Sequence, residues 1–200
     1  MRKRNCAKEM RRHRERILLL ERQVRLDPFT GLYNKTHGAE AIRQILDGES
    51  SGQHALLFLD TDGFKAINDS LGHAAGDEII RDLARRLTAC FRPDDVISRF
   101  GGDEYLVLAR DVPDRRWLTD RLDALAVCDH PVCSYTNSVG VALFPEDGRS
   151  FDALFQKADQ ALYSAKARKC TYVFASDPDT VYNRDPLAPG SALSLSQPCP

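Results

Sequence analysis

The sequence predicts an α+β fold, an α/β sandwich built on a mainly antiparallel central sheet. A continuous apolar run at 55–59 is typical of a central strand covered on both faces, and two short β-prone runs flank Gly101-Gly102 as in a hairpin. Between these runs lie stretches with apolar residues three and four positions apart, which is the helical period. The resulting order β-α-β-β-α-β is the split, ferredoxin-like arrangement, with helices on one face of four strands and a further helix and strand appended.

The composition is that of one globular domain with short extensions. The chain has 200 residues, 42% of them hydrophobic, and a net charge of -1, which argues against a dedicated nucleic-acid-binding protein. Its six cysteines are scattered without a C-x-x-C pair, so neither a disulfide framework nor a zinc site is expected, and a reducing cytoplasm fits this pattern. The apolar run at 17–20 is too short for a membrane span, and no signal peptide is recognisable.

The first segment, residues 1–26, is strongly basic and predicts an amphipathic helix. Met10, Ile17 and Val24 recur every seven residues, so the helix can bury its apolar stripe by pairing with a second copy of itself. Two alternatives stay open. One is a frayed helix with a solvated basic face, since His13 occupies a position of the stripe, and the other is an arm that binds nucleic acid.

The folded domain is predicted over residues 27–175. Asp27-Pro28 ends the first helix, because proline disfavours helical geometry in the residue before it. A helix is expected at 36–47, and the central strand then stops at Asp60. The buried side chains of that helix are expected to be Ala39, Ile42 and Leu46.

A second amphipathic helix is predicted from Asp77 to about Cys90, with Asp82 among its outward residues and Pro93 as its stop. Its inward face is apolar and consists of Ile80, Leu83, Ala84 and Leu87. After the hairpin we expect a helix at 114–127, a strand at 137–143, a helix at 151–167 and a strand at 171–174. Residues 176–200 have no hydrophobic period and are predicted to be a disordered tail.

Acidic side chains lie at the ends of neighbouring predicted strands. Asp60 ends the central strand, and Asp103 and Glu104 follow the glycine pair, which permits positive φ and the close approach of a ligand. Because the topology places the first strand beside the hairpin, Asp60 and Asp103 can converge. Two carboxylates and a main-chain carbonyl such as that of Thr61 suit Mg²⁺ when phosphates complete its coordination, which implies a nucleoside triphosphate. A Gly-Gly-Asp turn with a solvated rim is the alternative.

The residues after the central strand are suited to hold such a substrate. The N–H groups of Gly63 and Phe64 can form an anion-binding concavity, and Lys65 adds a positive charge. Asn68 and Asp77 can recognise a purine, because one carboxylate accepts from both N1–H and N2–H₂ of guanine but opposes the N1 lone pair of adenine. Asp77 is also suited to cap the helix that follows it.

Three separated motifs together resemble one family. The hairpin carries Gly101-Gly102-Asp103-Glu104-Tyr105, with Tyr for the usual Phe. The run 27–35 fits D-x-L-T-G-L-x-N-R, with Phe29 for Leu and Lys35 for Arg, and the run 60–77 fits D-x-D-x-F-K-x-x-N-D-x-x-G-H-x-x-G-D. From about 27 to 174 the chain therefore resembles the GGDEF family of diguanylate cyclases. The resemblance implies a palm of the nucleotide-cyclase type and a role in bacterial signalling.

The resemblance also implies a reaction, in which two GTP molecules condense to cyclic di-GMP and two pyrophosphates with Mg²⁺ or Mn²⁺ as cofactor. Each subunit of a homodimer would present one GTP to the other. By resemblance, Asp103 is the proton acceptor, Glu104 supports the metal site and Lys65 stabilises the transition state. The metal ligands would be Asp60, Thr61 and Asp103. The substrate-binding residues would be Gly63, Phe64, Asn68, His73, Asp77 and Lys166, although Lys166 is otherwise an ordinary solvated helix residue.

A short motif upstream of the hairpin resembles the inhibitory site of the same family. Arg92-Pro93-Asp94-Asp95 fits R-x-x-D, and five residues separate it from the Gly101-Gly102 pair. Arginine can bind guanine and phosphate in a bidentate manner, and the aspartate can accept from the guanine edge. Arg92 and Asp95 are therefore expected to bind cyclic di-GMP as an inhibitor.

The chain departs from the family after Lys166, where a glycine followed by an arginine is usual. Lys169 stands at the position of the glycine and Cys170 at that of the arginine, so one phosphate contact is lost or replaced and weaker GTP binding is expected. Two other functions stay open. One is a catalytically silent domain that senses GTP or cyclic di-GMP, and the other is a scaffold that dimerises through residues 1–26.

Overall fold

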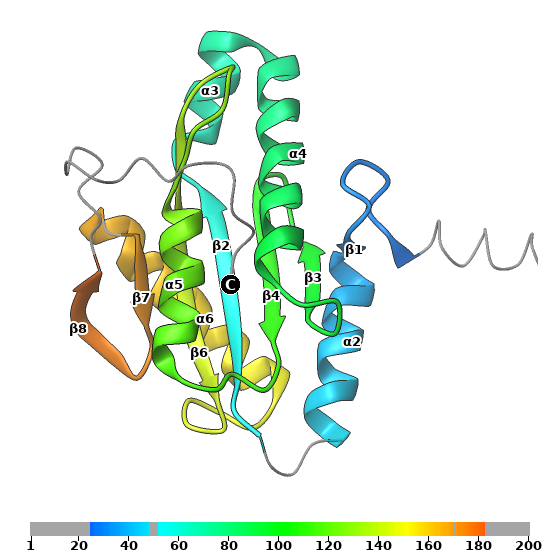
Figure 1. The fold of residues 1–200 in the computed structure, drawn as a ribbon, viewed down its shortest axis with the longest axis vertical. Coiled ribbons are helices and arrows are strands. Elements are labelled where there is room, and N and C mark those ends of the chain that lie inside the picture. Colours follow the sequence, from blue (N-terminus) through cyan, green and yellow to red (C-terminus); the bar gives the residue numbers. More distant parts are fainter. Residues whose placement is uncertain (1–24, 49–51, 170, 183–200) are drawn as a thin grey trace, which may run out of the picture.

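The computed structural model describes residues 25–48, 52–169 and 171–182. Its core is a four-stranded antiparallel sheet in the order β3-β4-β2-β6, which is the strand order of a ferredoxin-like fold and confirms the predicted class. Figure 1 shows β2 in the middle of this sheet. The four strands are β2 (His54–Thr61), β3 (Val96–Arg99), β4 (Glu104–Ala109) and β6 (Tyr135–Phe144).

Helices cover both faces of the sheet, rather than one face with a single addition. The side chains of β2 alternate: Leu57 and Leu59 pack with α4 and α5, whereas Leu56 and Phe58 pack with α2 and α6. The continuous apolar run of β2 follows from this double burial. The four helices are α2 (Lys35–Gly48), α4 (His73–Cys90), α5 (Arg115–Ala126) and α6 (Phe151–Arg168).

Close packing of α6 on β6 depends on one glycine. A Cβ at Gly140 would lie 1.9 Å from the carbonyl oxygen of Ala158 and 2.3 Å from the nitrogen of Leu162. Both are main-chain atoms and cannot turn away, so the helix lies directly on the strand at this point. This contact fixes where α6 ends relative to the sheet, and its last turn carries Lys166.

Short strands extend the sheet at both edges. Beside β3 lies β1 (Tyr33–Asn34), and beyond β6 come β7 (Tyr172–Phe174) and β8 (Asp177–Tyr182), while β5 (Val127–Cys128) pairs with the start of β6. Strand β8 corrects the prediction of a tail from residue 176, because 177–182 pair with β7. The predicted helix at 1–26 and the rest of the tail lie outside the described residues, apart from Arg25 and Leu26.

The region after β2 differs from the prediction. A further helix, α3 (Phe64–Leu71), precedes α4, and α4 begins at His73, four residues before the expected Asp77. No residue of α3 is fully buried, but Phe64 and Ile67 are partly buried against the core. With Leu71 they lie at helical spacing, so the sequence does contain a signal for this short helix. Gly72, with φ 85°, separates the two helices and is the residue before the first turn of α4. Asp77 lies inside α4 and does not cap it.

Asp82 is buried, although the helical period placed it on the outer face of α4. Its carboxylate accepts hydrogen bonds from the Tyr135 hydroxyl at 2.8 Å and from Arg86 Nε at 2.6 Å. Burial raises the pKa of Asp82, but the hydrogen bonds from Arg86 and Tyr135 outweigh it and hold that pKa below its usual value. Asp82 is therefore buried because Tyr135 of β6 and Arg86 of α4 both bind its carboxylate. No helix among the described residues has the length and apolarity of a membrane span.

Candidate active site

The two acids predicted to share a cation lie at the same edge of the sheet. Asp60 is the penultimate residue of β2 and pairs with Glu104, the first residue of β4, so Asp103 stands immediately beyond that pair. Burial raises the pKa of Asp103 to about 6, and the negative charge of Asp60 acts in the same direction. The two carboxylates are thus close enough to repel each other.

The ammonium group of a lysine side chain contacts this acidic pair. The Nζ of Lys166, from the last turn of α6, is 2.7 Å from Oδ1 of Asp60. The same ammonium group counteracts part of the rise in the pKa of Asp103. The carboxylate oxygens of Asp60 and Asp103 are hard donors, the kind of ligand that Mg²⁺ prefers, and the ammonium group of Lys166 now lies beside Asp60 where such an ion would be attracted. In the described part of the chain, no three His, Cys, Asp or Glu side chains are grouped to hold a metal, so main-chain and substrate oxygens would have to complete its coordination.

The glycine pair serves the turn differently from the expectation. Neither Gly101 nor Gly102 has a positive φ. Gly101 leaves room for the Glu104 carboxylate, because a Cβ there would lie 2.5 Å from Oε2 of Glu104 and would displace the end of that flexible side chain. The carbonyl of Glu104 also accepts from the N–H of Phe100 at 2.8 Å. The glycine therefore lets Glu104 approach the main chain beside Asp103.

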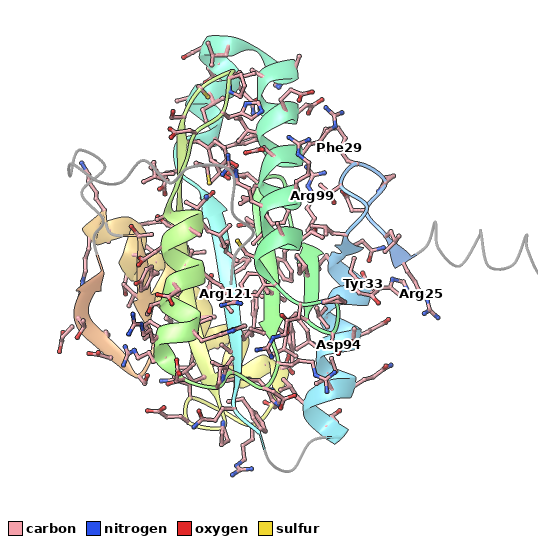
Figure 2. All side chains as sticks on the ribbon, in the orientation of Figure 1. Arg25, Phe29, Tyr33, Asp94, Arg99 and Arg121 are labelled. Carbon is pink, nitrogen blue, oxygen red and sulfur yellow. The ribbon has the colours of Figure 1, made fainter. Side chains whose placement is uncertain are left out.

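Arg99 donates hydrogen bonds to the turn and links it to the start of the domain. Its Nε and one terminal nitrogen donate to the carbonyl of Gly102 at 3.1 and 2.7 Å, and the other terminal nitrogen lies 3.3 Å from Oδ1 of Asp27. Asp27 in turn accepts from the N–H and hydroxyl of Thr30. Figure 2 shows Arg99 close to the loop that carries Phe29, and its guanidinium lies 5.2 Å from that ring. Arg99 directly precedes the Phe-Gly-Gly run but was not among the predicted site residues.

The loop after β2 brings the predicted phosphate-binding residues to the first turn of α3. Gly63 has φ 65° and is the residue before this helix, a conformation that favours glycine. Phe64 begins α3, and Lys65 follows it with an exposed side chain. The first N–H groups of a helix have no partner within it, so this end of α3 offers donors to an anion.

The predicted purine-binding residues lie where α3 packs on α4. A Cβ at Gly76 would be 2.1 Å from Oδ1 of Asn68, so the amide of Asn68 occupies space that any larger residue would take. Asp77 follows Gly76 and is half-buried, whereas His73 is exposed at the first position of α4. The structure thus brings Asn68 beside the turn of α4 that carries Asp77.

The R-x-x-D motif forms a compact turn. Asp95 is buried, and its carboxylate accepts from the N–H of Arg92 at 2.7 Å and from that of Arg110 at 2.8 Å. Burial raises the pKa of Asp95 more than these hydrogen bonds lower it. The guanidinium of Arg92 lies 4.7 Å from the ring of Trp117, and its positive charge acts to lower the pKa of Asp95.

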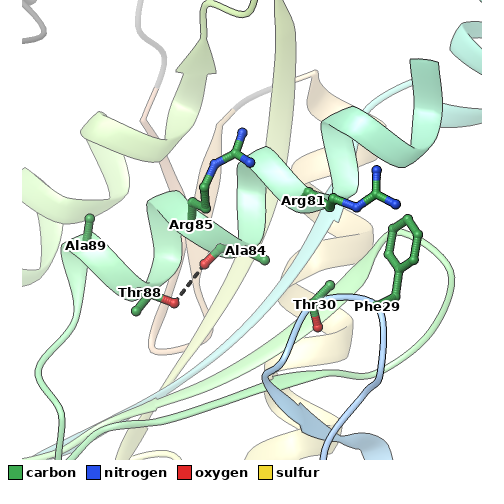
Figure 3. Close-up of a pocket in the computed structure, with 7 residues that line it drawn as sticks. All are labelled: Phe29, Thr30, Arg81, Ala84, Arg85, Thr88 and Ala89. Carbon is green, nitrogen blue, oxygen red and sulfur yellow. Dashed lines mark hydrogen bonds between the residues drawn. The ribbon is translucent and has the colours of Figure 1, made fainter. Parts of the chain in front are cut away.

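One hollow borders this motif, and a second lies beside it along α4. One, of about 430 Å³, is lined by Arg92 and Asp95 together with Thr88. The other, of about 450 Å³, also reaches Thr88 and is shown in Figure 3, where the side chain of Arg81 points toward Phe29. Its guanidinium lies 4.1 Å from that ring. The R-x-x-D turn therefore borders one open hollow, to which it contributes Arg92 and Asp95 and in which a ligand can lie.

Two departures from the family motifs have structural consequences. Tyr105, in place of Phe, is fully buried, and its hydroxyl donates to the carbonyl of Ile80 at 2.7 Å, so the extra oxygen is satisfied. Lys169 ends α6 with φ 54° and ψ 38°, the left-handed conformation that glycine adopts without cost. A lysine there is strained. Cys170 lies outside the described residues.

An antiparallel palm with paired acids at one strand edge defines a class, the nucleotide cyclases and related palm domains. The comparison with known families is more specific, since residues 24–171 match the family described as diguanylate cyclase, GGDEF domain. The chain belongs to this GGDEF family.

Related proteins act in cyclic di-GMP metabolism in both directions. The chain is 40% identical over 150 residues to the diguanylate cyclase DgcP of Pseudomonas aeruginosa, covering 70% of this chain and 22% of DgcP. It is 37% identical over 157 residues to the cyclic di-GMP phosphodiesterase NbdA of the same organism, covering 74% of this chain and 20% of NbdA. The chain thus spans about a fifth of the length of these relatives.

Solved structures show the same fold. The GGDEF domain of TpbB from Pseudomonas aeruginosa superposes with a TM-score of 0.64 at 34% identity, covering 72% of this chain and 89% of that one. The coiled coil and GGDEF domain of DgcB from Caulobacter crescentus, in complex with c-di-GMP, gives a TM-score of 0.77 at 24% identity, covering 86% and 96%. The second likeness shows the fold alone.

Proposed function

We propose that this protein is a diguanylate cyclase that condenses two GTP molecules into cyclic di-GMP with release of two pyrophosphates. The observation that carries the proposal is that Asp60 and Asp103 lie together at the ends of two neighbouring strands, β2 and β4, with the ammonium group of Lys166 beside Asp60. Such an arrangement has no evident structural purpose, because two partly buried acids that repel each other destabilise a fold. It is expected where a cation and a polyphosphate bind.

The residues present fit a divalent metal. Asp60, Asp103 and the carbonyl of Thr61 would hold Mg²⁺ or Mn²⁺, with Glu104 in support. When bound, the metal would neutralise charge on the triphosphate and acidify the attacking hydroxyl. Asp103, beside the metal, would accept that proton.

The substrate would lie between α3 and the end of α6. The N–H groups of Gly63 and Phe64 would bind the terminal phosphates, with Lys65 and Lys166 supplying positive charge. Asn68 and Asp77 would select guanine over adenine through the donor pattern of the base, and His73 would contact the substrate beside them. The cytoplasm, which supplies GTP, is the proposed location.

Catalysis would need two copies of the chain. One site holds one GTP, and each 3′-hydroxyl must attack the α-phosphate of the other nucleotide, so two sites have to face each other in a homodimer. We further propose that cyclic di-GMP inhibits the enzyme by binding at Arg92 and Asp95. The exposed guanidinium of Arg92 and the hollow beside it support this role.

A silent domain that binds GTP or cyclic di-GMP is the second candidate. The strained Lys169 and the missing family arginine at residue 170 favour it, because both alter the segment that follows Lys166. The GGDEF relationship to proteins named as phosphodiesterases is compatible with such a role.

One assay separates the two candidates. Purified protein is incubated with GTP and Mg²⁺, and the products are separated by chromatography. A cyclase forms cyclic di-GMP, and the Asp60→Ala and Asp103→Ala variants do not. If the wild-type protein binds GTP in calorimetry yet forms no dinucleotide, the sensor function holds instead. Arg92→Ala is expected to abolish inhibition by added cyclic di-GMP while initial turnover is unchanged.

A further inference from the structure

Three consecutive residues of β6 contact Thr61 and Asp62, where β2 ends and the loop before α3 begins. Residues Thr136, Asn137 and Ser138 lie opposite the end of β2, with Thr61 paired to Asn137 and Asp60 to Ser138. One step further, the N–H of Asp62 donates to the carbonyl of Thr136 at 2.9 Å. We refer to residues 136–138 as the β6 clamp.

Asp62 is fully engaged by two hydroxyl groups of the clamp. Its Oδ2 accepts from Thr136 Oγ1 at 2.6 Å, and its Oδ1 accepts from Ser138 Oγ at 2.6 Å. Thr136 and Ser138 point to the same face of the strand, since side chains alternate along it. Both distances are short for such bonds, as expected when the acceptor is charged.

The middle residue of the clamp holds Thr61 from the opposite face. Asn137 Oδ1 lies 3.2 Å from Thr61 Oγ1, and Asn137 Nδ2 donates to the carbonyl of Leu125 at 2.7 Å. Thr61 and Asn137 are 3% and 1% exposed, so these polar groups have no water to replace a lost partner. Asn137 thereby ties the end of β2 to the last turn of α5.

We propose that Asp62 is a positioning residue that acts through the β6 clamp, and that it is not a metal ligand although it belongs to the Asp60-Thr61-Asp62 motif. The clamp fixes the carbonyl of Thr61 and the start of α3 relative to Asp60. The inference rests on the proposed function, because those groups are the proposed metal and phosphate contacts. Gly63 is conformationally permissive, so contacts from β6 would help this loop to keep one geometry before substrate arrives.

The sharpest test compares Asp62→Asn with Asp62→Ala. An amide can accept from one hydroxyl and donate to the other, since Ser and Thr do both, so Asp62→Asn keeps the clamp but loses the charge. We expect Asp62→Asn to keep kcat and the half-saturating Mg²⁺ concentration within about threefold, and Asp62→Ala to lower kcat about tenfold and raise that concentration. Equal losses in both variants, or none in Asp62→Ala, would overturn the proposal.

A second variant removes the clamp from the other side. Thr136→Val with Ser138→Ala leaves Asp62 in place but without its two donors, and it should reproduce the Asp62→Ala result. Thr119→Val, which deletes a threonine hydroxyl that bonds only to Arg116 on an exposed face of α5, is the matched control. A double variant that behaves like this control would overturn the proposal.

Hydrogen exchange supplies a readout that does not depend on turnover. Amide exchange in a peptide covering 60–66 should rise in Asp62→Ala and in the double variant, and stay at the wild-type rate in Asp62→Asn, without metal or GTP. This measurement holds even if the wild-type protein makes no cyclic di-GMP, a result that would reject the proposed function alone. Unchanged exchange in Asp62→Ala would reject the clamp.

Discussion

The Nζ of Lys166 lies 2.7 Å from Oδ1 of Asp60, so the last turn of α6 meets the end of β2. This contact places the positive charge of Lys166 beside Asp60, whose own negative charge raises the pKa of Asp103. In the metal-free protein the same ammonium group lowers the pKa of Asp103 and so counteracts part of the rise caused by burial. The same side chain is partly exposed and can turn to a phosphate group when a substrate arrives.

Replacing Lys166 tests this dual role. We expect Lys166→Met to lower kcat/KM for GTP about tenfold, because one phosphate contact and the charge on Asp60 are both lost. Steady-state kinetics of cyclic di-GMP formation measures the change, with Lys157→Met, on an exposed part of the same helix, as the control. Kinetics of Lys166→Met that match those of Lys157→Met would show that Lys166 is only a solvated helix residue.

The stability of the metal-free protein should depend on Asp103. Its pKa is about 6 in the folded state against 3.8 for the ordinary group. Between these values the folded state binds more protons than the unfolded state, so the free energy of unfolding falls as the pH rises through this window. Urea unfolding in chelator at pH 4.5 and 6.5, for wild type and Asp103→Asn, measures the effect. The decrease should be smaller in the variant, and identical pH dependence would contradict the prediction.

Gly76→Ala should impair GTP binding without unfolding the protein. The new Cβ would lie 2.1 Å from Oδ1 of Asn68, and this flexible side chain can move away at little cost in stability. Because Asn68 is a proposed guanine contact, we expect KM for GTP to rise about tenfold with Tm nearly unchanged. Gly48→Ala, at a glycine with open space around it, is the control. A KM that stays at the control value would exclude Asn68 from the base site.

The two hydrogen bonds of Arg99 to Gly102 should matter for turnover. Arg99→Lys retains the charge but not the planar fork that reaches both Gly102 and Asp27. We expect kcat to fall about tenfold while KM changes little, because the turn beside Asp103 loses its support. Arg85→Lys, at an exposed residue of α4, provides the comparison. Equal kcat values in the two variants would limit Arg99 to a role in folding.

Lys169→Gly should stabilise the protein. Relief of the left-handed lysine is worth about 1 kcal/mol, and glycine is the residue that most often ends a helix in this way. Lys157→Gly, inside α6, should instead destabilise by about 1 kcal/mol. Thermal unfolding of both variants distinguishes these signs, and a lower Tm for Lys169→Gly would refute the interpretation.

Local patterns determined much of this fold. The apolar run at 55–59 marked a strand buried on both faces, and the spacing of Ile80, Leu83 and Leu87 marked the inner face of α4. Asp60 and Asp103 could be assigned to strand ends from the sequence, because Asp60 directly follows one hydrophobic run and Asp103 lies just before another. Such features depend only on neighbours in the sequence, which is why one chain sufficed to predict them.

Only the tertiary structure decided which groups meet. Asp82 is buried because Tyr135 and Arg86 donate hydrogen bonds to its carboxylate. Asp62 accepts hydrogen bonds from β6 because Thr136 and Ser138 lie opposite it. Lys166 reached Asp60 because α6 packs on the sheet through Gly140. Hydrophobic periodicity predicts which face of an element is buried, but hydrogen bonds between distant segments depend on register and packing, and no local pattern contains these.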